Sequence, residues 1–203
     1  TGSNGQKLTV PNILPILPRE EGISRLYSLS SLILPNGALF FCDTHVNIDP
    51  TAEQIAEMTF LAARTVRRFG MAPKAALLSH SSFGTANSDT ARKMRKAMAI
   101  LRAANPDFEL DGEMHADAAL SEALRGRLVS SSPLTGSANL MVMPTLDAAN
   151  IALTLLSAAT EALLVGPLLL GIAKPVHVMV PSVTARGIVN MTALAVAQAA
   201  VKT

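Results

Sequence analysis

The sequence predicts a three-layer α/β fold, in which helices cover both faces of a mostly parallel sheet. Short apolar segments of strand length alternate with longer segments whose apolar residues recur at helical spacing. The strand-like segments are continuously apolar, as expected for strands buried on both faces. With 203 residues, 49% of them hydrophobic, the chain is long enough to bury one sizeable core.

The predicted domain begins with a hairpin and a helix. Residues 28–34 and 38–43 read as two strands, because they flank the Pro-Asn-Gly turn signal at 35–37. A helix follows between residues 49 and 70, where Asp49-Pro50 supplies the start signal and Gly70 the stop. Its expected core face consists of Ile55, Thr59, Ala62, Val66 and Phe69.

Strands and helices continue to alternate along the rest of the chain. The further predicted strands are 74–79, 140–143, 163–169 and 176–180. The further predicted helices are 88–105, 147–159 and 186–201. Residues 1–24 are polar and rich in proline, and we expect an irregular lead-in or a tag remnant there. Residues 25–203 form the expected domain.

Composition excludes several classes of function. A net charge of +2 is too small to indicate a nucleic-acid partner. The apolar stretch 151–173 approaches the length of a membrane span. Glu161 and the Gly166-Pro167 pair interrupt it, so we interpret it as a buried helix followed by a buried strand and expect no membrane partner. The single cysteine, Cys42, lies in an apolar segment, which indicates a structural role in a reducing, cytoplasmic environment.

None of the candidate catalytic motifs in the sequence is specific for one kind of reaction. Neither a Gly-x-Gly-x-x-Gly segment after a strand nor a Walker loop is present. Serines beside His80 suggest a hydrolase, but the Gly-x-Ser-x-Gly elbow is missing, so a polar loop is favoured. The four histidines lie far apart in sequence and do not indicate a metal site. Asp111, Glu113 and Asp117 fit either an acid–base pair or, as we favour, turn and capping carboxylates.

The loop at residues 79–87 is the more informative segment. It is rich in small residues and lies between the end of a predicted strand and the start of a helix. Free backbone N–H groups at such a place favour an anion such as a phosphate, although an ordinary loop is an equal alternative. The following helix carries a row of cations that we expect to form a basic surface, while Met94, Met98 and Leu101 face the core. These cations are Arg92, Lys93, Arg95, Lys96 and Arg102.

Several segments together resemble one family. The resemblance is to the phosphotransacetylase-like domain of bacterial NADP-dependent malic enzymes, and it extends from about Gly22 to the end of the chain. The segments that carry it are residues 43–52 (ending in Asp49-Pro50-Thr51-Ala52), 72–84 (ending in Ser79-His80-Ser81-Ser82-Phe83-Gly84), Asp111-Gly112-Glu113-Met114-His115 with 117–120, Leu146-Asp147-Ala148-Ala149-Asn150-Ile151, 166–171, Lys174-Pro175-Val176-His177 and Val189-Asn190-Met191-Thr192-Ala193-Leu194.

The resemblance implies both a fold and a role. The fold would be of the phosphotransacetylase, or isocitrate/isopropylmalate dehydrogenase-like, type. The chain would be the second half of that domain, and Thr1 would not be its native start. The role would be to sense acetyl-CoA for a malic enzyme, which converts malate to pyruvate, carbon dioxide and NADPH, and to assemble subunits. NADP and a divalent metal would then bind only to an upstream malic enzyme domain.

The sequence departs from the family at three positions that, by resemblance, would be catalytic. Phosphotransacetylases have a serine and an arginine after the Lys-Pro-Val segment, and an acid before Ile-Val-Asn. Here those places hold Val180, Pro181 and Gly187, none of which has a side chain that can stabilise charge. The resemblance therefore implies a domain that does not transfer acyl groups. A working phosphate acetyltransferase and a purely structural assembly module are the alternatives.

The sequence also predicts a ligand site and self-association. The candidate acyl-CoA site is Ser79, Ser81, Ser82, Gly84, Arg92, Lys93, Asn150, Gly166, Lys174 and Arg186. We also expect the chain to self-associate, because the 186–201 helix carries an apolar stripe that needs a partner. The stripe consists of Ile188, Val189, Thr192, Ala195, Val196 and Ala199. The alternative is that this helix folds onto its own sheet.

Overall fold

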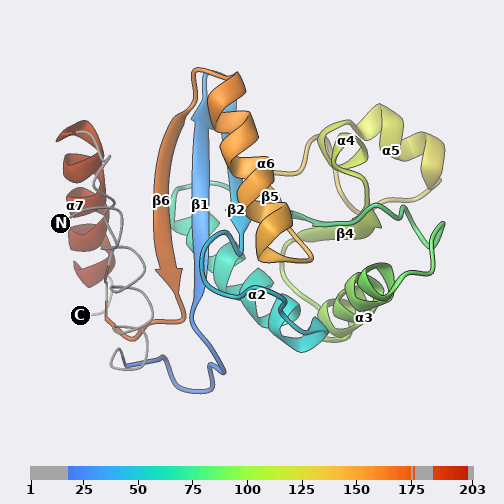
Figure 1. The fold of residues 1–203 in the computed structure, drawn as a ribbon, viewed down its shortest axis with the longest axis horizontal. Helices are drawn as coiled ribbons and strands as arrows, with labels where there is room; N and C mark the ends of the chain where they lie inside the picture. The colour runs from blue at the N-terminus through green and yellow to red at the C-terminus, as the bar shows by residue number, and fades with distance from the viewer. Residues whose placement is uncertain (1–17, 175, 177–184, 201–203) are drawn as a thin grey trace.

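The computed structural model describes residues 18–174, 176 and 185–200, and these form one mixed sheet with helices on both faces (Figure 1). The strand order is β4-β3-β5-β2-β1-β6. Neighbours β2, β5, β3 and β4 pair in parallel, whereas β1 pairs antiparallel with both β2 and β6. The strands are β1 Tyr27–Leu34, β2 Gly37–Cys42, β3 Lys74–Leu78, β4 Glu109–Met114, β5 Leu140–Val142 and β6 Leu163–Leu170. The helices are α2 Ala52–Arg68, α3 Asp89–Ala103, α4 Ala116–Leu120, α5 Glu122–Leu128, α6 Leu146–Ala159 and α7 Ala185–Ala200.

Two apolar layers fill the space on the two sides of the sheet, which confirms the predicted three-layer arrangement. On one side, Ile55 of α2 and Met94 of α3 pack with Leu29 and Phe40 of the sheet. On the other side, Ala149 and Leu153 of α6 and Ala118 of α4 pack with the sheet residue Phe41. Cys42 is buried and forms no disulfide, which agrees with the structural role expected from the sequence.

Helix α2 forms where its face was predicted but starts two residues later than expected. Thr51, not Asp49, is the N-cap, and it forms a reciprocal capping box with Gln54. Asp49 instead forms an ion pair with Lys93 of α3. The predicted core positions Ile55, Thr59, Ala62 and Val66 are all fully buried, and Phe69 is partly buried against the same core. Gly70 follows the C-cap at φ +77°, a backbone conformation that favours glycine.

Helix α3 confirms the sequence analysis at both ends. Ser88 is the N-cap, Asp89 lies in the first turn, and the helix ends before Asn105. The three residues predicted to face the core are buried: Met94, Met98 and Leu101.

Strand β4 was missed by the sequence analysis, and the reading of Asp111 and Glu113 as turn carboxylates was wrong. Both lie within β4 and are buried, with 2% and 1% of their surface exposed. Each is paired with an arginine of α3: Arg102 Nη2 lies 2.9 Å from Asp111 Oδ1, and Arg95 Nη1 lies 3.1 Å from Glu113 Oε1. These pairs allow a strand with two acidic residues to be buried. Asp117 does serve at a helix start, where it accepts from the Ala118 N–H.

The C-terminal half of the chain contains α6, β6 and α7. Helix α6 and strand β6 occupy the apolar stretch 151–173, but neither is fully buried as predicted. Ile151 and Leu155 of α6 are 62% and 66% exposed, and Leu163 and Leu164 at the start of β6 are 37% and 45% exposed. Among the described residues, no helix is long and apolar enough to cross a membrane. The predicted helix 186–201 is confirmed as α7, which lies outside β6 at one edge of the sheet (Figure 1). The predicted strand 176–180 falls outside the described residues except for Val176, which is not in a strand.

The segment before β1 is irregular in its described part, residues 18–24, apart from a β-bridge at Arg19. It is nevertheless bonded to the fold beyond β6. Glu20 N donates to Gly171 O at 2.9 Å, Arg19 bridges Ile172, and Ala173 N donates to Pro18 O at 2.8 Å. The segment therefore closes over the end of β6.

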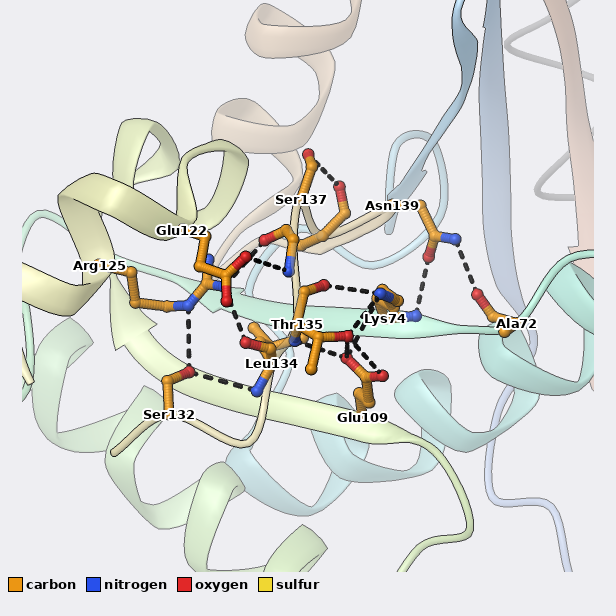
Figure 2. Close-up of polar contacts among 12 residues, drawn as sticks. Ala72, Lys74, Glu109, Glu122, Arg125, Ser132, Leu134, Thr135, Ser137 and Asn139 are labelled. Atoms are coloured by element: carbon orange, nitrogen blue, oxygen red, sulfur yellow. Dashed lines mark hydrogen bonds and ion pairs between the residues drawn. The ribbon is translucent and has the colours of Figure 1, made fainter. Parts of the chain in front are cut away.

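Arg125 holds α4, α5 and the segment after them together, and Figure 2 shows its bond to Ser132 in that segment. Arg125 is 1% exposed, and it forms no hydrogen bond with a carboxylate among the described residues. It donates instead to the carbonyls of Ala118 and Ala119 at the end of α4, and to those of Leu134 and Gly136. The acceptors at a helix C-terminus carry partial negative charge, which helps to stabilise the buried cation.

We expect Arg125→Met to lower the free energy of unfolding by about 3 kcal/mol, because it leaves several buried carbonyl oxygens without a donor. Chemical denaturation monitored by circular dichroism measures the change. The matched control is Arg127→Met, on the same helix at an exposed position, which should change stability by less than about 0.5 kcal/mol. Equal stability of the two variants would contradict this role for Arg125.

Candidate functional site

The carboxyl ends of β2, β5, β3 and β4 meet at one edge of the sheet, where ligands of open α/β sheets commonly bind. Hydrogen bonds join the loops that leave these strands. Ser79 N donates to Met114 O at 2.9 Å, and Met143 N donates to Cys42 O at 3.0 Å. Lys93 of α3 reaches the same edge, where Nζ donates to Pro144 O at 2.8 Å. The 79–87 loop therefore lies among several connected loops.

The backbone of the 79–87 loop is held by its own side chains and by β4. Six consecutive N–H groups have protein acceptors. The bonds are Ser81 N to Ser79 Oγ, Ser82 N to Thr85 Oγ1, Phe83 N to Glu113 O, Gly84 N to Glu113 Oε1, Thr85 N to Ser82 O and Ala86 N to Ser81 Oγ. The expectation that this stretch offers free backbone donors to a phosphate is therefore wrong, because those donors are already satisfied within the protein.

Glu113 occupies the place where that expectation would have put an external anion. Its Oε1 accepts from Ser81 Oγ at 2.8 Å, from Gly84 N at 2.9 Å and from Arg95 Nη1 at 3.1 Å. Burial alone would raise the pKa of this carboxyl, but the hydrogen bonds from Gly84, Ser81 and Arg95 outweigh it and hold the pKa below the ordinary value of 4.5. Glu113 is thus a buried carboxylate that fixes the shape of the loop.

Polar groups remain at the outer side of this loop. His80 Nε2 lies 3.2 Å from Ser88 Oγ, and His115 Nε2 lies 2.7 Å from His80 O. The two histidines, far apart in sequence, are therefore adjacent in space. Within the described part of the chain, the N–H groups of Asp89 and Thr90, in the first turn of α3, have no hydrogen-bond acceptor. Such donors favour a negatively charged group.

Of the α3 cations, Arg92, Lys96 and Arg102 are exposed as predicted, whereas Lys93 and Arg95 are partly buried. Each of the five is paired with an acid. Arg92 pairs with Asp89, Lys93 with Asp49, Lys96 with Glu53 (2.6 Å), Arg95 with Glu113 and Arg102 with Asp111. The expected basic surface is therefore largely neutralised. Arg92 is the more available of the two cations predicted to bind a ligand, because 52% of its side chain is exposed against 18% for Lys93.

The remaining predicted site residues divide between the two halves of the sheet. Asn150 of α6 lies near the loops of the carboxyl edge, where its Nδ2 donates to Thr44 O at 3.2 Å. Gly166 lies within β6, packed so closely on β1 that a Cβ would stand 3.0 Å from Leu29 O. Lys174 is exposed after β6, and Arg186 lies in α7. Strands β5, β2 and β1 separate β6 from β3, so these three residues are not brought to the 79–87 loop.

The three positions with altered residues are only partly described. Gly187 lies in α7 and is partly buried, whereas Val180 and Pro181 fall outside the described residues. Within the described part of the chain, no group of three or more His, Cys, Asp or Glu side chains could hold a metal ion.

A second buried carboxylate at this edge was also missed. Asp43 is 2% exposed and accepts from Asn47 N at 2.9 Å, from Asn47 Nδ2 at 2.6 Å and from His45 N at 3.2 Å. It thereby shapes the loop between β2 and α2. Burial lowers the pKa of neighbouring His45, so its ring is neutral at physiological pH. The signal in the sequence was an acid directly after a continuously apolar strand.

Comparison with known proteins identifies the family. The family model described as "Phosphate acetyl/butaryl transferase" matches residues 2–196. The chain is 51% identical over 187 residues to the NAD-dependent malic enzyme of Rhizobium meliloti, and 51% identical over 180 residues to the NADP-dependent malic enzyme of Salmonella typhimurium. These matches cover 92% and 88% of this chain but 24% of each malic enzyme, so the chain spans about a quarter of those relatives' length.

Solved structures agree with the sequence comparison. The phosphotransacetylase of Streptococcus pyogenes superposes with a TM-score of 0.89 at 32% identity, which covers 96% of this chain and 60% of that one. The phosphotransacetylase fold type expected from the resemblance is therefore confirmed. The chain belongs to the phosphate acetyl/butaryl transferase family, and its sequence places it with the part of that family found in bacterial malic enzymes.

Proposed function

We propose that this chain binds acetyl-CoA, or another acyl-CoA, as a regulatory and assembly domain of a cytoplasmic malic enzyme. The proposal rests on one combination of observations. The chain is about 50% identical to malic enzymes, but it has other residues at the three expected catalytic positions. NADP and a divalent metal would bind to the upstream malic enzyme domain. Acetyl-CoA, downstream of the pyruvate that such an enzyme makes, would act as a feedback signal.

The absence of acyl transfer is part of the proposal. Transfer between CoA and phosphate passes through states with developing negative charge, which need several kcal/mol of stabilisation from fixed polar groups. Val180 and Gly187 have no polar side chain, and Pro181 has no donor. A domain with these residues keeps the fold for binding without the groups for chemistry.

The proposed contact surface is the outer side of the 79–87 loop together with the start of α3. The loop is preformed by Glu113, so little conformational entropy would be lost on binding. The CoA phosphates would lie near Arg92, Lys93 and the unpaired N–H groups of Asp89 and Thr90.

Two rival functions can be separated from this proposal by experiment. Similarity to phosphate acetyltransferases, such as that of Paracoccus denitrificans at 39% identity over 163 residues, favours a working enzyme. Sustained synthesis of acetyl-CoA from acetyl phosphate and CoA by the full-length parent protein would establish that rival. Loss of both acyl-CoA binding and turnover would favour a purely structural module.

We also propose self-association through α7. Val189 and Val196 are 66% and 65% exposed, and Ile188 is 42% exposed, so the outward face of this helix is apolar. Covering it with a second chain would remove apolar surface from water, worth about 25 cal/mol per Å². Light scattering after size exclusion tests this: a mass that stays at 21.3 kDa as concentration rises would contradict it.

We expect acetyl-CoA to bind the chain in calorimetric titration, and Arg92→Glu to weaken that binding by about tenfold through repulsion of the CoA phosphates. The matched control is Arg68→Glu, an exposed arginine in the last turn of α2, which should bind acetyl-CoA as the parent does. Unchanged affinity in the Arg92 variant would move the ligand away from α3.

We expect Glu113→Gln to reduce the acid sensitivity of the protein. A carboxyl whose pKa is lowered in the folded state contributes stability that is complete above its unfolded pKa and is lost as the pH falls through the folded pKa. The parent melting temperature should therefore fall between about pH 6 and about pH 3, and the variant should fall less.

The control for this experiment is Glu161→Gln, at an exposed position after α6. It should retain the parent's full loss of melting temperature on acidification. If all three proteins lose melting temperature in parallel, Glu113 is not a major source of the pH dependence.

A further inference from the structure

A groove lies at the amino-terminal ends of β3 and β4, opposite the edge that carries the 79–87 loop. It has a volume of about 690 Å³, within the range of small-molecule sites. The groove is built from the ends of α2 and α3 and from the segments that lead into and cover the two strands. Its lining residues are Arg67, Ala72, Pro73, Arg102, Asn105, Pro106, Asp107, Phe108, Glu109, Leu110 and Pro133.

Hydrogen bonds between side chains and backbone fix the walls of this groove (Figure 2). Asn139 Nδ2 donates to Ala72 O at 2.8 Å, and Lys74 Nζ donates to Thr135 O at 2.6 Å. Glu109 accepts from Thr135 N at 2.7 Å and lies 3.6 Å from Lys74 Nζ, so its charge is offset locally. The groove is therefore preformed and need not be assembled by a ligand.

Two guanidinium groups border the groove, one from the last turn of each helix. Arg67 is 42% exposed. Its Nη2 lies 2.8 Å from Oδ1 of Asp107, which is 78% exposed, and also donates to Asp107 O at 3.0 Å. An ion pair so accessible to water contributes little, and an incoming anion can replace it. Arg102 is 59% exposed and uses Nη2 to bind buried Asp111, which leaves its other N–H groups without an acceptor among the residues that the structure describes.

The groove also has an apolar part, beside the polar side chains of Asn105, Asp107 and Glu109. Pro73, Pro106 and Pro133 have no backbone N–H, and the ring of Phe108 packs edge-on against Phe60 with a centroid separation of 5.9 Å. These walls suit a flat apolar group, while the arginines suit a carboxylate or phosphate.

We propose that this groove is a second ligand site, which takes a small anion with a flat apolar body and binds its acidic group between Arg67 and Arg102. The site is separate from the acyl-CoA surface, because α3 carries Arg102 in its last turn and Arg92 in its first. The proposal does not depend on the proposed function.

Titration of the 203-residue chain with 1-naphthyl phosphate tests the proposal. We expect saturable binding at one site, with inorganic phosphate and neutral 1-naphthol each binding at least about tenfold more weakly because each supplies only half of the contacts. Arg67→Gln should weaken 1-naphthyl phosphate about tenfold. Ala72→Trp, which fills the exposed wall of the groove without changing charge, should abolish binding.

The matched control is Arg64→Gln, one turn earlier on α2, where the arginine is 45% exposed and pairs with Glu20. It should bind the probe as the parent does, and melting curves of all variants should show that each remains folded. The proposal is overturned if binding does not saturate, if Arg67→Gln and Ala72→Trp bind as the parent, or if inorganic phosphate binds as tightly as the probe.

Discussion

The ion pairs between β4 and α3 are the interactions on which both edges of this sheet depend. Asp111 and Glu113 lie two residues apart on an edge strand and are almost fully buried. Each would be costly to bury alone, and each is held by an arginine from the same helix. Arg95 and Arg102 stand two turns apart on α3, so the two pairs fix the helix along the strand as well as against it.

Each pair then organises a different region. Glu113, which pairs with Arg95, also accepts hydrogen bonds from Ser81 Oγ and Gly84 N. These bonds fix the backbone of the 79–87 loop. Asp111, which pairs with Arg102, also accepts a hydrogen bond from the Ser132 hydroxyl, at 2.7 Å to Oδ2. The same hydroxyl accepts from Arg125 Nε at 3.0 Å. Buried Arg125 in turn positions α4, α5 and the segment that borders the groove.

Helix α3 connects these two regions. Its 15 residues span about 22 Å, and about 15 Å of that length separates Arg92, at the candidate acyl-CoA surface, from Arg102, at the groove. A ligand that drew Arg102 away from Asp111 would loosen one of the two attachments between helix and strand. The loop at the other end is held by the second attachment, the ion pair between Arg95 and Glu113.

The sequence by itself determined the α/β alternation, the core faces of α2 and α3, the hairpin, and the location of the 79–87 loop. These follow from local periodicity and capping, which act within a few residues. The family resemblance was likewise legible in ordered segments, and the comparisons confirm it. The pattern misplaced the start of α2 because Thr51 and Gln54 form a stronger cap than the Asp49-Pro50 signal.

Only the tertiary structure decided the role of the charges. The sequence placed a row of cations on α3 and acids at 111 and 113, but their pairing joins residues 9 to 18 positions apart, and Lys93 pairs with an acid 44 positions away. Local pattern carries no information about such partners. A buried acid in a strand is unfavourable by every local measure, and it becomes stable only when a distant arginine and backbone N–H groups meet it in the folded protein.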